Sequence, residues 1–316
     1  MPHELLVSTL PLKGVGPKLV QWITDFVSNR SFKVKVNSVI SRRGFATTGC
    51  PQGTVMGSLL FMFFVDQVKE VLAERVSFYI YADDVKLVRP IRSPEDCKVL
   101  QSALDDFNHW TERMGLRLSV HKCGVMRIGS DKFSSNYRIG DVTLQSLRSV
   151  KDLGVILTPC LRFTDHVTHV LKKCAMICAW IMRSFVVEML SVYMRMFNSH
   201  VLPHVLYCSS VWRPLNNCDM VALCRMQRRY VRRVERRCGL TKGALPIYEI
   251  TDMIKDMDVK YLRKLMRKDD LFDEMFDLSA SKTRKAFVFS AKQIAKTETV
   301  KNLFPWRIAS VINGSH

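Results

Sequence analysis

Two adjacent carboxylates, Asp83 and Asp84, stand between two apolar runs in the stretch VSFYIYADDVKLV, residues 76–88. Such runs around a short polar centre predict a β-hairpin with the carboxylates at or near its turn. Two carboxylates about 4 Å apart repel each other by about 4 kcal/mol at an effective dielectric constant of 20. A divalent cation reverses that sign, and Mg²⁺ prefers hard oxygen ligands completed by substrate phosphates. Taken alone, however, an Asp-Asp pair in a hairpin is more often a solvated turn.

The segments before the hairpin are those that must position it. Residues 32–45 (FKVKVNSVISRRGF) alternate apolar and basic side chains, which predicts a second hairpin with one cationic face. Residues 47–58 (TTGCPQGTVMGS) predict a loop that feeds one long helix, roughly Thr54 to Glu74. Two short helices are expected before these segments, from 2–10 and 16–30.

After the hairpin, Ser93-Pro94-Glu95-Asp96 predicts a helix start, because it combines a cap, a proline at the first position and acids on the positive dipole end. Three strand-rich pieces follow at 115–129, 137–145 and 150–158. Beyond them, 166–185, 191–212 and 218–238 are typical of helices. We therefore expect an α+β first part, residues 1–158, and a mostly helical second part, residues 159–316.

The chain is strongly basic, with 48 Lys and Arg against 29 Asp and Glu, a formal net charge of +19 and a pI of about 9.7. Such an excess favours a polyanionic partner, because phosphate contacts release counterions. A merely basic protein is the alternative. Ten cysteines without a CxxC pair favour a reducing compartment. The N-terminus lacks the layout of a signal peptide, and no apolar run is long enough for a membrane span, so we expect an intracellular protein.

Seven of these basic residues are arginines in RMQRRYVRRVERR, residues 225–237. Leu223, Met226, Tyr230 and Val234 can form one apolar helix face. Like charges four residues apart destabilise an isolated helix, and a phosphate backbone relieves that repulsion. We therefore predict nucleic-acid binding by the remaining face. Its residues are Arg228, Arg229, Arg232, Arg233, Arg236 and Arg237.

In their order, these segments resemble the reverse transcriptase family, and most closely its non-LTR (LINE-type) retrotransposon branch. The resemblance rests on GCPQGTVMGSLLF, YADDVKLV, LDDFNHWTERMGLRLSVHKCGVM and KDLGVIL, and it continues through the helical part to the final FPWRIASVING. It implies a partial polymerase palm followed by a thumb-like helical region. It also implies RNA-directed DNA polymerisation with an RNA template, a DNA primer, dNTP and Mg²⁺, inside a nuclear or cytoplasmic ribonucleoprotein and without a membrane.

The resemblance also assigns roles to single residues. Asp83 is the expected metal ligand of the hairpin, with Asp84 as its companion. Lys122 is expected to act as general acid or charge partner near the leaving pyrophosphate. The residues expected around the substrate are Gln52 and Gly53, beside the nascent base pair, and Tyr81, which packs against the primer or closes the hairpin.

The second catalytic Asp of the family belongs to a segment that the resemblance places ahead of Met1. Phosphoryl transfer by two metal ions needs carboxylates from two separated strands. Asp66 and Asp25 lie in predicted helices and do not match that position. We therefore expect a truncated gene copy, or a gene model cut short, that is inactive as a polymerase. The alternative is a non-catalytic RNA- or DNA-binding protein. A viral RNA polymerase fits less well, because YADD replaces GDD in the hairpin.

Overall fold

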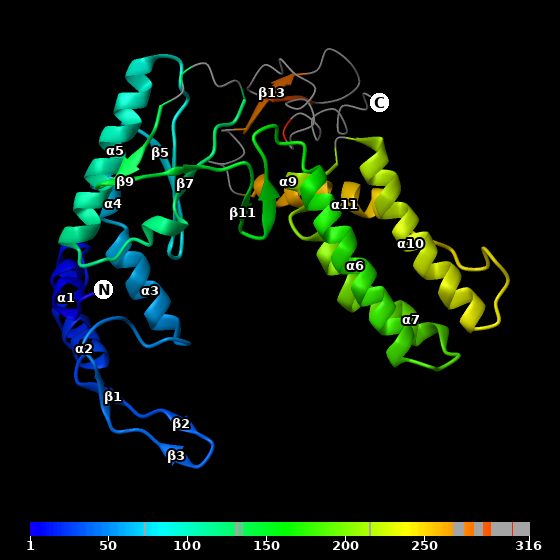
Figure 1. Ribbon diagram of the computed structural model, residues 1–316, viewed down its shortest axis with the longest axis horizontal. Coiled ribbons are helices and arrows are strands. Elements are labelled where there is room, and N and C mark those ends of the chain that lie inside the picture. Colours follow the sequence, from blue (N-terminus) through cyan, green and yellow to red (C-terminus); the bar gives the residue numbers. More distant parts are fainter. Residues whose placement is uncertain are drawn as a thin grey trace. The chain divides into compact units, whose positions relative to one another are not determined.

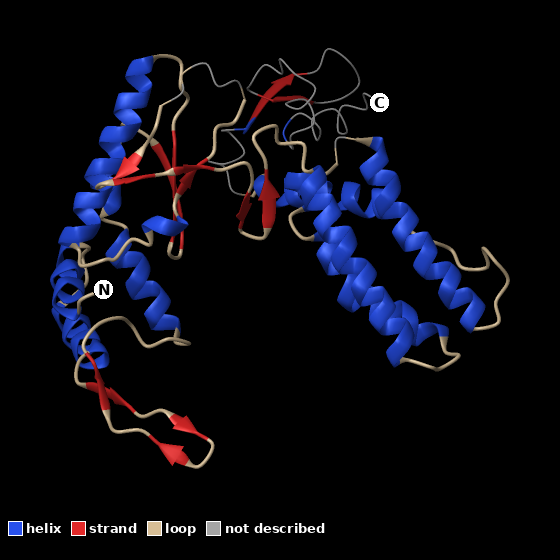
Figure 2. Ribbon diagram, viewed as in Figure 1, coloured by secondary structure: helices blue, strands red, loops and turns tan. Residues whose placement is uncertain are grey.

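The computed structural model describes residues 1–72, 74–129, 133, 135–214, 216–267, 275–280, 287–291 and 305. The chain divides into two compact units. Unit 1 comprises Met1–Val125 and Ser130–Leu147, and unit 2 comprises Met126–Gly129 and Arg148–His316. Within these residues the chain combines helices with small sheets, consistent with an α+β class (Figure 2).

Unit 1 contains α1 (His3–Leu12), α2 (Pro17–Val27), β1 (Arg30–Phe32), β2 (Lys35–Val36), β3 (Val39–Ile40), β4 (Gly44–Ala46), α3 (Val55–Val65), α4 (Val68–Leu72), β5 (Ser77–Tyr81), β6 (Asp84–Val88), α5 (Pro94–Arg113), the 3₁₀ turn η1 (Val120–Lys122), β7 (Gly124–Val125), β8 (Arg138–Ile139), β9 (Val142–Thr143) and β10 (Gln145–Ser146). Its core joins α1 to α5. The fully buried members include Leu6, Leu10, Val27, Phe64 and Leu72.

Helix α5 begins where the sequence predicts. Ser93 accepts the backbone N–H of Asp96, and the Asp96 carboxylate accepts the backbone N–H of Ser93, which completes a capping box. Arg89 from the end of β6 donates to the same carboxylate at 2.8 Å. The N–H of Arg92 and the guanidinium of Arg89 together lower the pKa of Asp96 to about 2. The hairpin is thereby tied to the first turn of the helix that follows it.

The long helix predicted over 54–74 is wrong in one respect, because it is broken into α3 and α4 at Asp66 and Gln67. The Lys13 ammonium reaches the Asp66 carboxylate at 2.9 Å, and Lys69 forms a second ion pair with it. The Gln67 amide donates to the Thr9 hydroxyl at 2.8 Å. Contacts from α1 therefore hold the break, and the Asp66 carboxylate takes part in them.

Every sheet within the described residues has two strands. The predicted strand-rich piece at 115–129 is mostly irregular: it provides only η1 and the two residues of β7, which pair in parallel with β10. The predicted hairpin at 32–45 is present as two short ladders, β1–β4 and β2–β3. In Figure 1 this ribbon extends beyond α1 and α2.

Unit 2 contains β11 (Val150–Asp152), β12 (Val155–Leu157), α6 (Thr164–Ser184), α7 (Leu190–Met196), the π-helical turn η2 (Phe197–Val201), α8 (Leu202–Leu206), α9 (Ser209–Trp212), α10 (Asn217–Arg237), α11 (Ile250–Leu265), β13 (Phe276–Ala280) and β14 (Phe287–Ala291). The helix predicted over 191–212 is continuous from Leu190 to Leu206, with the π-helical turn η2 inside it, and is interrupted once, before α9. Cys208 adopts a left-handed backbone (φ 51°), which ends α8 and redirects the chain into α9.

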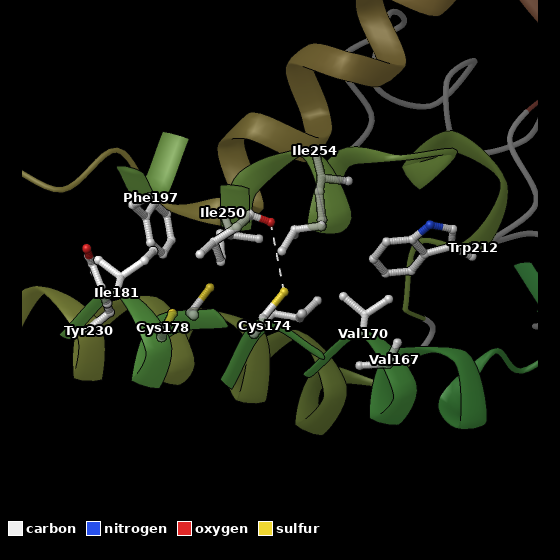
Figure 3. Close-up of a cluster of buried hydrophobic side chains, with 14 of the residues drawn as sticks. Val167, Val170, Cys174, Cys178, Ile181, Phe197, Trp212, Tyr230, Ile250 and Ile254 are labelled. Carbon is white, nitrogen blue, oxygen red and sulfur yellow. Dashed lines mark hydrogen bonds between the residues drawn. The ribbon is translucent and has the colours of Figure 1, made fainter. Parts of the chain in front are cut away.

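The core of unit 2 lies between α6, α10 and the shorter helices, as Figure 3 shows. Trp212, Tyr193 and Tyr230 are its largest fully buried side chains. His166 is also buried, and its Nδ1 accepts the backbone N–H of Ile156 at 3.2 Å. Burial, with His169 and Lys151 nearby, lowers the pKa of His166 to about 4, so this histidine is neutral. Among the described residues, no helix is both long enough and apolar enough to span a membrane.

Candidate functional site

Hairpin β5–β6 places the two predicted carboxylates at its tip. The strands pair from Ser77 with Val88 to Tyr81 with Asp84, which leaves only Ala82 and Asp83 in the turn. Ala82 takes a left-handed backbone (φ 52°), as tight hairpin turns require. Asp83 therefore lies in the turn and Asp84 is the first residue of β6, so the predicted hairpin is confirmed.

The two faces of this hairpin differ. Phe78, Ile80, Val85 and Leu87 alternate with the exposed residues and pack half-buried against the core of unit 1. The opposite face carries Tyr79 and Tyr81, which are 61% and 64% exposed, together with Asp84. Cross-strand partners share a face, so Tyr81 lies beside Asp84. The predicted site residues thus belong to the solvent-facing side of a hairpin anchored from behind.

The loop Cys50–Gly53 is shaped by the first turn of α3. The Thr54 hydroxyl donates to the Pro51 carbonyl at 2.8 Å and accepts the N–H of Gly57 at 3.0 Å. A Cβ on Gly57 would lie 2.5 Å from the Pro51 carbonyl oxygen, which only glycine avoids. Gly53 has φ +78°, a conformation that glycine adopts without strain. Gln52 and Gly53 are both exposed on this constrained loop.

A second anchor of this loop is not predicted by the sequence. The Gly49 carbonyl accepts the Arg30 guanidinium at 2.9 Å and lies 2.9 Å from His3 Nε2. Arg30 Nε also donates to the Val27 carbonyl at 3.0 Å. In the sequence Arg30 is one of many basic residues, and nothing in its spacing predicts that it joins the end of α2 to residue 49.

Lys122 is exposed at the end of η1. Directly after it, the chain forms β7, where Leu147 covers Gly124 so closely that a Cβ there would lie 2.6 Å from Leu147 Cγ. The Leu147 N–H also donates to the Val125 carbonyl at 2.7 Å. These contacts hold the backbone beyond Lys122 while its ammonium group stays in solvent.

All six predicted catalytic and substrate residues are therefore exposed in unit 1: Gln52, Gly53, Tyr81, Asp83, Asp84 and Lys122. Neither carboxylate of the hairpin forms an ion pair or hydrogen bond within the described residues. Two exposed carboxylates are a donor set of the kind that holds one Mg²⁺ when phosphates complete its shell. The part of the chain that the structure describes has no group of three His, Cys, Asp or Glu side chains suited to a metal ion.

One face of helix α10 in unit 2 is buried in the core. Leu223, Tyr230 and Val234 are buried, as the apolar pattern predicts. Two polar residues, Gln227 and Glu235, are also buried on this face, which the sequence does not predict. Gln227 donates to the Tyr248 carbonyl at 2.8 Å and accepts the Ile250 N–H at 3.1 Å, while the buried Glu235 carboxylate accepts the Gly243 N–H at 3.0 Å. The helix is thereby fixed against the loop before α11.

The opposite face of α10 is cationic. Arg225, Arg229, Arg232 and Arg236 follow one another at spacings of four, three and four residues, so they form a single stripe along the helix. All four are exposed, and none forms an ion pair within the described residues. Together with Arg228 of the same helix and Thr251 of α11, this stripe lines a pocket of about 670 Å³. Arg233 and Arg183 of α6 line a second, open hollow of about 510 Å³.

Two of the predicted arginines are engaged within the protein. Arg237 is half-buried and donates to the carbonyls of Met182 and Phe185 at the end of α6. Arg228 forms an ion pair with Glu249 at 2.8 Å. Arg225, by contrast, was not among the predicted contacts, although its position on the stripe follows from helical periodicity. We define the arginine stripe as Arg225, Arg229, Arg232 and Arg236.

Cys174 and Cys178, four residues apart on α6, take structural positions. Cys174 and Cys178 are buried in the core of unit 2, and burial raises the pKa of their thiols to about 11 and about 12. The Cys174 thiol donates to the Val201 carbonyl at 3.9 Å (Figure 3). Both side chains therefore pack in the core of unit 2.

The chain is similar in sequence to known proteins of one family. Residues 1–157 match the family model described as reverse transcriptase (RNA-dependent DNA polymerase). Over 166 residues the chain is 30% identical to the RNA-directed DNA polymerase from mobile element jockey of Drosophila melanogaster. The aligned region covers 49% of this chain and 18% of that protein. It is 26% identical to the jockey enzyme of Drosophila funebris over 79% of this chain and 29% of that protein.

A third relative is the probable RNA-directed DNA polymerase from transposon X-element of Drosophila melanogaster, 24% identical over 60% of this chain and 22% of that protein. The chain thus spans less than a third of the length of each of these relatives. The matched region contains the PQG loop, the YADD hairpin and Lys122, in the order found from the sequence. The chain therefore belongs to the reverse transcriptase family, and its relatives are polymerases of LINE-type, non-LTR retrotransposons.

Proposed function

We propose that this chain is a segment of an RNA-directed DNA polymerase that holds a template or primer strand through the arginine stripe of α10. The observation that carries the proposal is the stripe itself: four exposed arginines without an ion-pair partner in the described residues, on a helix whose other face is buried. The relatives are polymerases by name, and a polymerase requires nucleic acid at its surface.

The dimensions of the stripe suit a phosphate backbone. Its end residues, Arg225 and Arg236, are eleven positions apart, which corresponds to about 16 Å along a helix axis. Phosphates of one duplex strand recur about every 3.4 Å along the duplex axis, so several of them fit along this length. Because the core fixes the rotation of α10, little ordering of the helix accompanies binding.

Binding of a labelled RNA–DNA duplex tests this proposal. Replacing two stripe residues, R229Q with R232Q, removes two phosphate contacts and lowers the magnitude of the log–log salt slope by about 2. At low salt we expect binding about 10-fold weaker or more. The matched control is R162Q with R195Q, two exposed arginines of the same unit that lie outside α10. Equal losses in both double variants would assign the effect to net charge and contradict a specific stripe.

In the proposed chemistry, the carboxylates of Asp83 and Asp84 would bind one Mg²⁺ together with substrate phosphates. When bound, such an ion neutralises charge on the phosphates during transfer. The constrained loop presents Gln52 and Gly53 to the base pair being formed, and the Lys122 ammonium is the proposed proton donor or charge partner at pyrophosphate. Each of these residues is solvent-accessible, as such a contact requires.

The proposal further holds that these 316 residues alone do not extend a primer. Transfer by two metal ions needs carboxylates from two separated strands, whereas the described residues offer only the adjacent pair of one hairpin in this region. The test is Mg²⁺-dependent extension of a DNA primer on an RNA template by the purified chain. We expect no product above background. Extension that disappears in Asp83→Asn would overturn the proposed inactivity.

A nucleic-acid-binding protein without catalysis is the second candidate, and the same arginine stripe favours it. The two candidates differ in the role of the carboxylates. If the hairpin retains a polymerase's metal-binding role, Mn²⁺ in the presence of a nucleoside triphosphate binds the chain detectably by electron paramagnetic resonance and binds D83N more weakly. If the chain only binds nucleic acid, the two proteins give the same spectrum while duplex binding persists in both.

A further inference from the structure

The ribbon formed by residues 31–46 contains a cluster of positive charge that none of the roles above uses. Its two ladders are out of step: Arg30 pairs with Ala46 and Phe32 with Gly44, whereas Lys35 pairs with Ile40. One extra residue is therefore accommodated between the ladders, on the strand that returns. This is a β-bulge, in which two residues face one.

Val34 and Ser41 are hydrogen-bonded across the ribbon, which leaves Arg42 and Arg43 opposite Lys33. The residues at the bulge are therefore all cationic. No acidic residue occurs in the sequence between Asp25 and Asp66. The three side chains are exposed and form no ion pair within the described residues. Like charges facing each other across strands destabilise a sheet, so the bulge concentrates positive charge at a cost to the ribbon. A polyanion reverses the sign of that interaction.

Aromatic rings flank the bulge on the same ribbon. Phe32 lies across Gly44, where a Cβ would come within 2.9 Å of Phe32 Cζ, and the side chain is still 56% exposed. The ring is thus supported by backbone on one side and open to solvent on the other. Phe45 pairs with Ser31 on the opposite face and is 69% exposed. Exposed rings beside cations are the surface on which unpaired bases stack while phosphates bind nearby.

We propose that the ribbon 31–46 binds single-stranded nucleic acid, with phosphates at Lys33, Arg42 and Arg43 and a base stacked on Phe45 or Phe32. Every residue from 31 to 43 is exposed, so a strand can approach from either face. The residues of this site belong to unit 1, whereas those of the arginine stripe belong to unit 2. The site also does not rest on polymerase activity, because single-strand binding needs neither nucleotide nor metal.

Single-stranded ligand is favoured over duplex by the rings. Base pairs in a duplex are stacked on each other and offer no free face to Phe45, whereas every unpaired base has one. A purely electrostatic surface would not need exposed phenylalanines, which are costly in water at these exposed fractions. A protein partner is the competing occupant, because Val34, Val36, Val39 and Ile40 of the ribbon are also exposed. The three cations beside the rings, with no acidic residue between Asp25 and Asp66, favour the polyanion.

The experiment measures fluorescence anisotropy of short fluorescein-labelled oligouridylate, oligothymidylate and a duplex with the full chain, at low and at physiological salt. R42Q with R43Q is expected to weaken single-strand binding about 10-fold at low salt and to lower the salt slope by about 1.4. Phe45→Ala is expected to weaken it about 5-fold or more without changing the slope, and to leave duplex binding unchanged. Stronger binding of one oligonucleotide assigns the ribbon to RNA or to DNA.

The matched control for charge is R92Q with R113Q, two exposed arginines of unit 1 outside the ribbon. We expect less than about a twofold change. Thermal unfolding of each variant checks that the fold is intact, which the exposure of all replaced side chains favours. The proposal is overturned if the double variant R42Q with R43Q binds single strands as the control does. It is also overturned if F45A weakens duplex binding as much as single-strand binding. It is equally overturned if sedimentation shows a self-association that F45A abolishes while oligonucleotide binding is unchanged.

Discussion

Hairpin β5–β6 and helix α10 both present charged side chains on one face and apolar side chains on the other, but they are anchored differently. The anchoring residues of the hairpin, such as Ile80 and Val85, are half-buried, whereas Tyr230 and Val234 of the helix are buried. The helix also has hydrogen bonds from Gln227 and Glu235 to a neighbouring loop. The stripe is therefore held in a fixed orientation, while the carboxylates depend on a two-stranded sheet, the least stable kind.

The largest expected effect tests this difference in anchoring directly. Tyr230→Ala removes a buried ring that lies 4.9 Å from Phe197 and a hydrogen bond of 2.9 Å to the Tyr193 carbonyl. We expect a loss of about 4 kcal/mol in the free energy of unfolding. Ile80→Ala, from the half-buried face of the hairpin, should cost less than about 2 kcal/mol.

Urea unfolding of the full chain, followed by circular dichroism, measures both losses. Tyr230→Phe is the matched variant, because it keeps the ring and removes only the hydrogen bond, for which about 1 kcal/mol is expected. If Ile80→Ala costs as much as Tyr230→Ala, the hairpin is anchored as firmly as the helix and the contrast fails.

An intermediate effect is expected from acid, and it should be specific to unit 2. The pKa of His166 is about 4 in the folded chain, where burial favours the neutral ring, against about 6.5 in an unfolded chain. Below pH 6.5 the unfolded state binds the proton and the folded state does not, so stability falls as the pH decreases. Between pH 7 and pH 5 this amounts to about 2 kcal/mol, with the remainder lost toward pH 4.

His166→Asn is the comparison variant, because its amide oxygen can accept the Ile156 N–H but does not titrate. We expect the difference in unfolding free energy between pH 7 and pH 5 to shrink by about 2 kcal/mol in this variant. An unchanged difference would show that the acid response arises from other groups.

The smallest effect concerns the carboxylates themselves. Asp84→Asn removes one of two adjacent negative charges that have no ion-pair partner within the described residues. Because both are exposed, we expect the free energy of unfolding, measured by urea unfolding, to rise by less than about 0.5 kcal/mol at low salt. This gain should vanish at high salt. A loss of stability instead would indicate that Asp84 makes a contact that supports the hairpin.

The sequence predicts those parts of the fold that depend on neighbours along the chain. The start of α5 follows from Ser93 and Asp96, and the YADD hairpin follows from its alternating residues. The break at Asp66 does not follow, because Lys13 and Thr9 hold it from another helix. Local helix propensity over 54–74 is satisfied by one helix or two, and only packing decides between them.

The same distinction applies to the candidate sites. The arginine stripe follows from helical periodicity, although Arg237 is engaged with the end of α6 in a contact that no local pattern contains. The buried Glu235 looks like one more surface charge until the loop that donates to it is placed. The bulge at Arg42 and Arg43 depends on the register of two ladders, which alternation alone does not fix.

The amide of Gln227 has a consequence for how this helix tolerates mutation. Its two ends serve the Tyr248 carbonyl and the Ile250 N–H at the same time, so neither an acid nor an apolar side chain replaces it. In the proposed function, by contrast, each stripe arginine contributes separately, so its replacement reduces nucleic-acid binding by one step. A lineage that accumulates substitutions in α10 would therefore lose its affinity gradually through the arginines but abruptly through this one uncharged residue.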